Sequence, residues 1–324
     1  MQRKKIAVLM GGPSAEREVS LNTGNAILEA LREKNYDVVG IDLDPTQLVE
    51  QLREHKIEVV FNAIHGLYGE DGRLQGALEL LGIPYTGSGV LASAMAMDKG
   101  ISKRLFVSVD IPTPRYQLLL RQDGIGEEVL DIILAEFEAP FVVKPSTQGS
   151  TIGLTIVQEP EELAEALQKA FSYDREVLVE EFIDGSELTV AIIGGQMPEA
   201  LPVIEIVPYS GLYDYHSKYT KGATEYFVPA RIDAETALLT QEVSLAAFKI
   251  LGCSGVARVD VRLDPTNHPY VLEVNTIPGM TATSLVPKAA AAAGQSKTVV
   301  TSATRRSSRN VARKSVASQN HNDC

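Results

Sequence analysis

Apolar residues recur with two different periods along the first ninety residues of the chain. Short apolar runs predict strands, and runs with an apolar residue every three or four positions predict amphipathic helices. We expect strands over 4–10, 37–43 and 58–64 and helices over 20–34, 45–56 and 72–82. This alternating order predicts a parallel sheet covered by helices, with ligands at the carboxyl ends of the strands. Polar loops fall at two of those ends, over 11–18 and 65–72.

The middle of the chain predicts a second unit of mixed helices and strands. Residues 89–109 have a helical pattern, and Pro112 and Pro114 after them are typical of a domain entrance. Helices are predicted over 127–138 and 160–171, and strands over 141–146, 151–157 and 176–183. The connection over 144–153 is rich in Gly, Ser and Thr, so the hairpin of this unit has a tip of small residues.

Strands predominate in the third part of the chain. They are predicted over 188–195, 201–208, 257–264 and 269–276, with one helix over 233–252. The polar, aromatic-rich segment 208–229 has the length of a lid or a binding loop. Residues 295–324 are basic and rich in Ser, Thr, Asn and Gln, and show no period, so we expect a disordered tail. A basic interaction arm is the alternative.

Composition restricts the classes of partner. The net charge of −12 argues against a nucleic-acid partner, because no overall basic field neutralises phosphates. The two cysteines, Cys253 and Cys324, are too few for a disulfide framework, and Cys253 lies in an apolar context; a cytoplasmic setting follows. The apolar run over 6–10 is too short for a signal peptide, and no stretch is long enough to cross a bilayer.

Oxygen-bearing side chains gather on one predicted hairpin. Glu273 and Asn275 are two positions apart, so they project from the same face of their strand. Asp260 on the preceding strand can face them across a short turn. Two carboxylates and an amide suit Mg²⁺, and no Cys/His cluster favours zinc. An ordinary polar hairpin face is the alternative.

Cationic side chains and a small-residue loop indicate a phosphate site. Lys99 follows an apolar helical run and Lys144 ends an apolar strand, and both can reach phosphate as point charges. Backbone N–H groups of 144–153 can approach anionic oxygens, although a plain hairpin turn is an alternative. Neither a Walker A loop nor GxGxxG is present. The carboxylates of 180–187 can accept from adenine or ribose, or form a solvated acidic corner.

Seven stretches together resemble the D-alanine–D-alanine ligase family of the ATP-grasp superfamily. They are GGPSAEREVSLNTG, NAIHGLYGEDG, GIPYTGSGVLASAMAMDK, FVVKPSTQGSTIG, YDYHSKYT, ARVDVRL and LEVNTIPGMTATSLVP. The resemblance implies an α/β and α+β fold of three domains, with a Rossmann-like parallel sheet first and nucleotide held between two α+β units. The implied ranges are 1–98, 99–185 and 186–294, the last with the lid 208–229 and the metal site, and then the tail 295–324.

The resemblance implies ATP-dependent ligation of two D-alanines through an acyl phosphate, which supplies a peptidoglycan precursor. It also implies two Mg²⁺ (or Mn²⁺) and a homodimer. Tyr219 in the lid favours D-alanine as the second substrate. The alternatives are a D-alanine–D-lactate or D-alanine–D-serine ligase, and a catalytically silent ATP-binding protein.

The resemblance also assigns roles to individual residues. In the implied catalytic set, Glu16 holds the ammonium of the first D-alanine, and Ser150 and Tyr219 form a hydrogen-bonded trio with it. Arg258 and the Gly279 N–H stabilise the oxyanion. Substrate-binding positions are His65, Ser284 and Leu285. Nucleotide contacts are Lys99, Lys144, Glu180, Glu187 and Lys218. Metal ligands are Asp260, Glu273 and Asn275.

Two stretches depart from the family pattern. Glu181 stands beside Glu180 where the family usually has a lysine. After 289–294 the family continues with an amphipathic helix that closes the last domain, whereas this chain continues with the basic tail. Loss of a packed helix exposes apolar surface, so we expect lower stability than in relatives.

Overall fold

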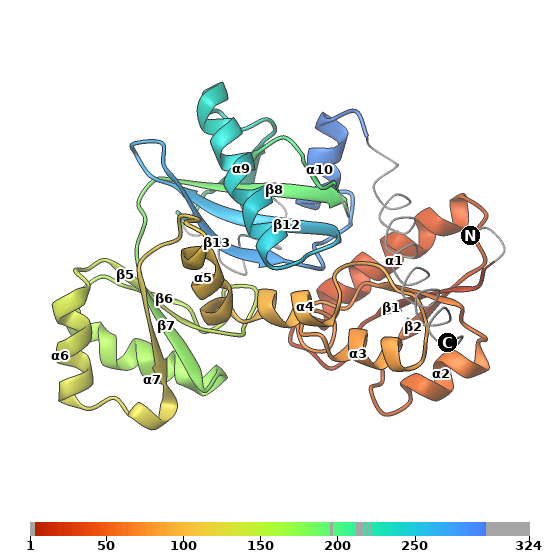
Figure 1. The fold of residues 1–324 in the computed structure, drawn as a ribbon, viewed down its shortest axis with the longest axis horizontal. Helices are drawn as coiled ribbons and strands as arrows, with labels where there is room; N and C mark the ends of the chain where they lie inside the picture. The colour runs from red at the N-terminus through yellow and green to blue at the C-terminus, as the bar shows by residue number, and fades with distance from the viewer. Residues whose placement is uncertain (1–3, 195–196, 212–216, 218–219, 221, 296–324) are drawn as a thin grey trace, which may run out of the picture.

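The computed structural model describes residues 4–194, 197–211, 217, 220 and 222–295. Its strands form three sheets (Figure 1). The first sheet is parallel, in the order β2-β1-β3, and consists of β1 (Ile6–Met10), β2 (Val38–Asp42) and β3 (Val59–Asn62). Alternate β1 residues face two apolar cores. Helix α1 (Arg17–Glu33) covers one core, and α2 (Leu48–Glu54) and α3 (Arg73–Leu80) cover the other. The predicted helix-covered parallel sheet is confirmed.

The second sheet is antiparallel, in the order β4-β7-β5-β6. It contains β4 (Tyr116–Leu120), β5 (Phe141–Pro145), β6 (Thr155–Val157) and β7 (Glu176–Glu181), and α6 (Glu127–Glu136) and α7 (Leu163–Tyr173) pack on it. Short 3₁₀ turns lie at Arg121–Asp123 and Pro160–Glu162. The prediction of a strand from residue 151 is wrong at its start, because residues 149–154 form successive turns before β6 begins.

The third sheet has the order β11-β10-β8-β12-β13. Its strands are β8 (Ser186–Gly194), β10 (Ile204–Pro208), β11 (Thr224–Phe227), β12 (Gly255–Leu263) and β13 (Pro269–Asn275), with β9 (Glu199–Ala200) beside β8. Helices α9 (Ala234–Ile250) and α10 (Leu285–Ala292) cover opposite faces. Val259 faces the α9 core and Val256 the α10 core, as the two-residue period of a strand requires.

The helical structure predicted over 89–109 is confirmed, and it is divided into two helices. The segment forms α4 (Val90–Met97) and α5 (Lys99–Ser108), separated by Asp98, whose backbone is extended. The Asp98 carboxylate accepts from the Ile101 N–H at 3.0 Å and from the Ser146 hydroxyl at 3.1 Å. Asp98 therefore acts as the N-cap of α5 and joins that helix to the loop after β5.

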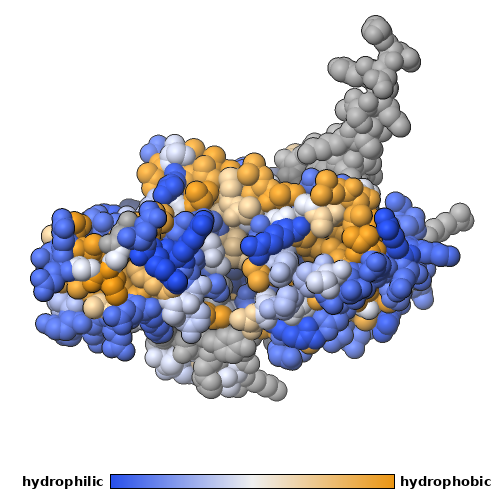
Figure 2. Space-filling model, turned by 90° about the horizontal axis from the view of Figure 1, so that it is seen from below, coloured by the Kyte–Doolittle hydropathy of each residue, from blue (hydrophilic) through white to orange (hydrophobic). Residues whose placement is uncertain are grey.

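Hydrophilic side chains cover much of the face in Figure 2, with apolar side chains gathered along one edge of it. Within the described ranges, no helix is both long and apolar enough to cross a membrane. Cys253 is buried, as expected, and burial raises the pKa of its thiol to about 12. The predicted tail, apart from Gln295, lies outside the described residues.

Candidate functional site

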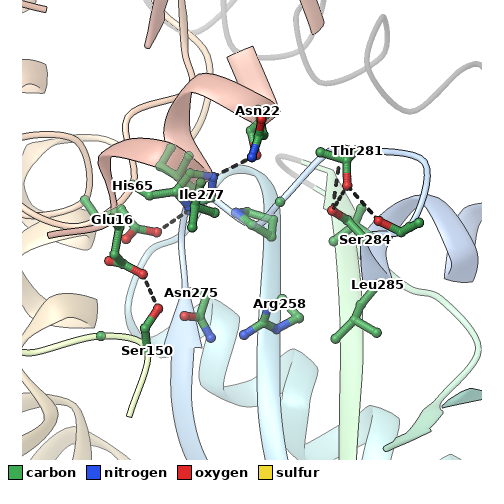
Figure 3. A pocket seen from close by; sticks show the side chains of 18 of the residues that line it. Glu16, Asn22, His65, Ser150, Arg258, Asn275, Ile277, Thr281, Ser284 and Leu285 are labelled. Atoms are coloured by element: carbon green, nitrogen blue, oxygen red, sulfur yellow. Dashed lines mark hydrogen bonds between the residues drawn. The ribbon is translucent and has the colours of Figure 1, made fainter. Parts of the chain in front are cut away.

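The larger cavity has a volume of about 500 Å³ and lies where α1, the loop after β5, β12, β13 and the start of α10 meet (Figure 3). Nine residues predicted from the sequence line it: Glu16, His65, Ser150, Arg258, Glu273, Asn275, Gly279, Ser284 and Leu285. They come from segments as far apart as residues 16 and 285. Apart from Glu273 and Asn275, which share a strand face, the fold therefore brings together positions that the sequence related only through their resemblance to one family.

Glu16 is held by a tight loop after β1. Gly11 and Gly12 both have positive φ, and a Cβ at Gly11 would collide with the Asp42 carboxylate, so this turn requires glycine. The Gly12 N–H donates to Asp42 at 3.2 Å. Ser14 donates to the His65 carbonyl at 2.8 Å and accepts from the Glu16 N–H at 3.2 Å. These bonds direct the Glu16 carboxylate into the cavity.

Ser150 lies in the loop after β5 and donates its hydroxyl to the Glu16 carboxylate (Figure 3). Ser150 and Thr151 have φ of 52° and 64°, in the left-handed region that side chains other than glycine rarely adopt. Such conformations concentrate at functional sites, where the surrounding structure holds them. The contact joins the loop after β5 to the loop after β1.

Two titratable side chains flank Glu16. The His65 ring nitrogen Nε2 lies 3.0 Å from the Thr23 hydroxyl, and burial, with a smaller effect of Arg258, lowers the pKa of His65 to about 4. Glu70 accepts from the Gly66 N–H at 2.8 Å and from the Ile277 N–H at 3.0 Å. Burial, followed by the charge of Glu16, raises the pKa of Glu70 to about 8. His65 is therefore neutral at pH 7.

The predicted hairpin of β12 and β13 is confirmed. Asp260 pairs with Glu273 and Arg258 with Asn275 in the strand register. Arg258 donates to Asp260 at 2.8 and 2.7 Å, and the Asn275 amide donates to Asp260 at 3.0 Å. Val274 points to the opposite face and is buried in the α9 core. The oxygens therefore share one face of the hairpin.

The start of α10 forms the far wall of the cavity. Ser284 is the N-cap residue and Leu285 begins the helix. The Ser284 hydroxyl accepts from the Thr281 N–H at 3.1 Å, and the two hydroxyls lie 2.8 Å apart. A Cβ at Gly279 would lie 2.8 Å from the Ser284 hydroxyl, so the close approach of this turn needs glycine. A helix N-terminus attracts anionic groups.

A second cavity, of about 140 Å³, lies between the second and third sheets. It shares Gly149, Ser150 and Glu273 with the larger cavity, so the two adjoin. The predicted nucleotide contacts in the described residues all line it: Lys99, Lys144, Glu180 and Glu187, together with the predicted metal ligand Asp260.

The charged side chains of the second cavity pair with one another. The Lys99 ammonium donates to the Gln148 carbonyl at 2.7 Å and lies 3.1 Å from Glu273. Lys144 donates to the Glu180 carboxylate. Glu187 lies 3.7 Å from Arg262. The cavity therefore combines ammonium groups with carboxylates beneath an apolar wall that includes Val142, Ile156 and Leu272.

Lys218 and Tyr219, predicted for the nucleotide and the lid, lie outside the described residues. Glu181, where the family usually has lysine, pairs with Arg115 at 3.1 Å. Sequence reasoning missed Glu70, although it lies in the quoted HGLYGEDG loop. It also missed Lys103, whose position in a helix of mixed composition carries no signal.

The hairpin oxygens suit a hard cation. In the chain as described, no group of three or more His, Cys, Asp or Glu side chains is placed to hold a metal ion. Asp260, Glu273 and Asn275 supply two carboxylates and one amide, which leaves positions for phosphate oxygens and water, as Mg²⁺ commonly has. Lys99 and Arg258 lie within 3.1 Å of these carboxylates, so the face already attracts cations. The donor set fits Mg²⁺.

Two antiparallel α+β units that face each other across a cavity of lysines and carboxylates define the ATP-grasp class of proteins. Comparison with known proteins narrows the class. The domain family described as "D-ala D-ala ligase N-terminus" matches residues 5–53 and 45–88, and "D-ala D-ala ligase C-terminus" matches residues 105–302. The chain belongs to the D-alanine–D-alanine ligase family.

Individual relatives agree with this assignment. The chain is 50% identical over 293 residues to the D-alanine–D-alanine ligase of Pelotomaculum thermopropionicum, covering 90% of this chain and 92% of the relative. A solved structure of the Bacillus anthracis ligase complexed with ATP superposes with a TM-score of 0.82 at 38% identity, covering 96% of this chain and 99% of that one. The VanG D-Ala:D-Ser ligase of Enterococcus faecalis superposes at 0.81 with 34% identity, covering 93% and 98%.

Proposed function

We propose that this protein is a D-alanine–D-alanine ligase, which joins two D-alanines at the expense of ATP and supplies a peptidoglycan precursor. The observation that carries the proposal is the hydrogen bond from Ser150 to Glu16. It joins the loop of the predicted phosphate site to the residue predicted to bind the first ammonium. The two cavities thereby adjoin, so a substrate carboxylate in one can meet a phosphoryl group from the other.

ATP binds in the second cavity in this proposal. Lys99 and Lys144 contact its phosphates, and Glu180 and Glu187 accept from adenine and ribose. Lys218 adds a further phosphate contact from the lid. The mixture of an apolar wall and paired charges supports this assignment, because adenine needs apolar contact while phosphates need cations.

The first D-alanine binds in the larger cavity with its ammonium against Glu16. Its carboxylate oxygen attacks the γ-phosphorus of ATP, ADP leaves, and an acyl phosphate forms. Phosphoryl transfer of this kind depends on alignment and neutralisation of charge. Ser150 fixes the Glu16 carboxylate, and Tyr219 completes the trio as the lid closes.

The second D-alanine binds with its carboxylate at Ser284 and Leu285, beside the α10 N-terminus. Its amine, having lost a proton, attacks the acyl carbon and gives a tetrahedral intermediate. Arg258 and the Gly279 N–H stabilise the oxyanion, and phosphate leaves as the peptide bond forms. His65 lies beside this substrate as a neutral ring, consistent with its lowered pKa.

Asp260, Glu273 and Asn275 would hold two Mg²⁺ or Mn²⁺. When bound, these ions neutralise phosphate charge. The protein is further proposed to be a homodimer that works in the cytoplasm, where ATP is supplied, without a nucleic-acid or membrane partner.

The test is phosphate release from ATP and Mg²⁺ by the purified full chain, with and without D-alanine, together with product analysis. D-alanine-dependent release and formation of the dipeptide are the expected results. Competition with D-serine and D-lactate distinguishes the related ligases, whose fold is shared with the VanG enzyme. ATP binding without D-alanine-dependent release would refute the proposal and favour a silent nucleotide-binding protein.

A further inference from the structure

Lys103 on α5 is among the largest side chains of the described residues that are completely buried, at 0% exposure. Moving an ammonium out of water is costly unless it is paired and hydrogen-bonded. Its Nζ lies 2.9 Å from the Glu180 carboxylate and donates to the Thr113 hydroxyl at 2.7 Å and to the Pro114 carbonyl at 3.3 Å. The Tyr116 ring lies 5.3 Å away. Lys103 is therefore a buried charge held by one ion pair and two hydrogen bonds, and the proposed reaction assigns it no role.

Glu180 lies between two lysines that differ in position. Lys144 pairs with one carboxylate oxygen and lines the second cavity, where the proposed function assigns it to ATP phosphate. Lys103 pairs with the other carboxylate oxygen of Glu180. It is buried behind the carboxylate and is not among the residues that line the cavity. When Lys144 turns toward a phosphate, Glu180 keeps Lys103 as its counter-ion. Without Lys103, Glu180 would then be a buried carboxylate without a cation.

Lys103 also connects the second sheet with the third sheet. The Thr113 hydroxyl that accepts from Lys103 donates in turn to the Val271 carbonyl of β13 at 2.7 Å. Val271 is two residues from Glu273 and donates its N–H to the Pro112 carbonyl at 2.8 Å. One ammonium therefore connects Glu180 in the second sheet with the strand that carries two of the proposed metal ligands, Glu273 and Asn275.

We propose that Lys103 is a positioning residue of the nucleotide site, which holds Glu180 charged and oriented toward adenine while Lys144 serves the phosphates. The inference rests on the proposed ATP site. Burial acts to raise the pKa of Glu180, but Lys103 first and Lys144 second outweigh it, so its pKa lies below the usual value. This order agrees with Lys103 as the principal counter-ion.

The test compares four forms of the full chain: wild type, K103M, E180Q and K103M/E180Q. Methionine preserves the length of the side chain and removes the charge. Equilibrium binding of ATP and of GTP is measured with Mg²⁺ and without D-alanine. K249M is the control, because Lys249 is exposed in the last turn of α9. Thermal melting shows whether each variant is folded.

We expect K103M to weaken ATP binding about ten-fold or more and to reduce the preference for ATP over GTP, because Glu180 then no longer faces the adenine amino group correctly. In the E180Q background the same change should have an effect of less than about three-fold, since residues that act through one another are not additive. The KM for D-alanine should not change. K249M should match the wild type in all measurements.

The proposal is overturned if K103M binds both nucleotides as the wild type does, or if the effects of K103M and E180Q multiply. If K103M does not fold, ATP binding is compared between K103M/E180Q and E180Q, because the double variant removes both charges. Equal ATP binding by these two variants supports the proposal, and a further large loss in K103M/E180Q overturns it. Failure of the ligase assignment is seen separately, as wild-type protein that binds ATP without D-alanine-dependent phosphate release.

Discussion

Replacing Glu70 by alanine should loosen the turn that carries the proposed oxyanion donor. The Glu70 carboxylate accepts from the N–H groups of Gly66 and Ile277, which lie in different domains of the predicted architecture. Glu70 and Ile277 are 207 positions apart in the sequence. Ile277 is two residues from Gly279, so the carboxylate holds this turn against the loop after β3.

The size of the effect follows from the two N–H groups that lose an acceptor. A buried donor left unsatisfied costs roughly 1–3 kcal/mol. Glu70 lines the 500 Å³ cavity, so water can replace part of what is lost. Removal of Glu70 also relieves its repulsion with Glu16. We therefore expect the lower end of this range for each of the two N–H groups, so that E70A has about 2 kcal/mol less free energy of unfolding.

The effect depends on pH in a defined direction. The pKa of Glu70 is raised from 4.5 to about 8 by burial and then by Glu16. A raised pKa means that the folded protein favours the protonated carboxyl, so the contribution of Glu70 to stability falls as pH rises from 4.5 through 8. The stability difference between wild type and E70A should therefore shrink between pH 6 and pH 9.

Urea denaturation at pH 6 and pH 9, with turnover measured in parallel, tests this expectation. E50A is the matched control, because Glu50 is exposed in the first turn of α2. E70Q keeps one acceptor oxygen and should lie between wild type and E70A in stability and in kcat. An E70A protein as stable and as active as E50A would show that the two N–H groups do not depend on Glu70.

Three further predictions concern the site. H65N should lose less stability than wild type between pH 7 and pH 5, because a His pKa lowered from 6.5 to about 4 destabilises the folded protein as pH falls through that window. The difference in free energy of unfolding is about 2 kcal/mol at pH 5. Denaturation curves that change in parallel with pH for the two proteins would contradict it. S150A removes the charge-assisted bond to Glu16, so the transition-state stabilisation calculated from kcat/KM for D-alanine should fall by about 1.5–3 kcal/mol. Steady-state kinetics that match wild type would refute the role of Ser150. D260N should raise the Mg²⁺ concentration for half-maximal phosphate release about ten-fold, whereas D264N at the hairpin turn should leave it unchanged; equal Mg²⁺ curves for all three proteins would remove Asp260 from the metal site.

The sequence by itself determined the parts of the site that depend on local geometry. A strand has a period of two, so Glu273 and Asn275 had to share a face and Val274 had to point into the core. A short turn lets its two strands pair, so Asp260 was expected to face Glu273 or Asn275, and the register of the folded chain places it opposite Glu273. Such relations extend over a few residues, which is why they can be predicted without a tertiary structure.

The two lengths of helix within 89–109 mark the limit of that reasoning. The apolar period continues through the whole segment, and Asp98 alone is a weak signal. The break becomes definite because the Ser146 hydroxyl, 48 positions away, donates to Asp98 and supports its extended conformation. Local propensity allowed either outcome, and a tertiary contact decided between them.

Only the tertiary structure decided which distant charges meet. Lys103 pairs with Glu180, and the Glu70 carboxylate accepts from the Ile277 N–H. Both contacts join residues too far apart in the sequence for any periodicity to relate them. A buried charge is stable only where its partners are already placed, and packing of three sheets sets those places. The sequence thus determined most of the elements, the hairpin face and the family. The packed chain determined which carboxylate each lysine neutralises, because that depends on distance and burial rather than on order along the chain.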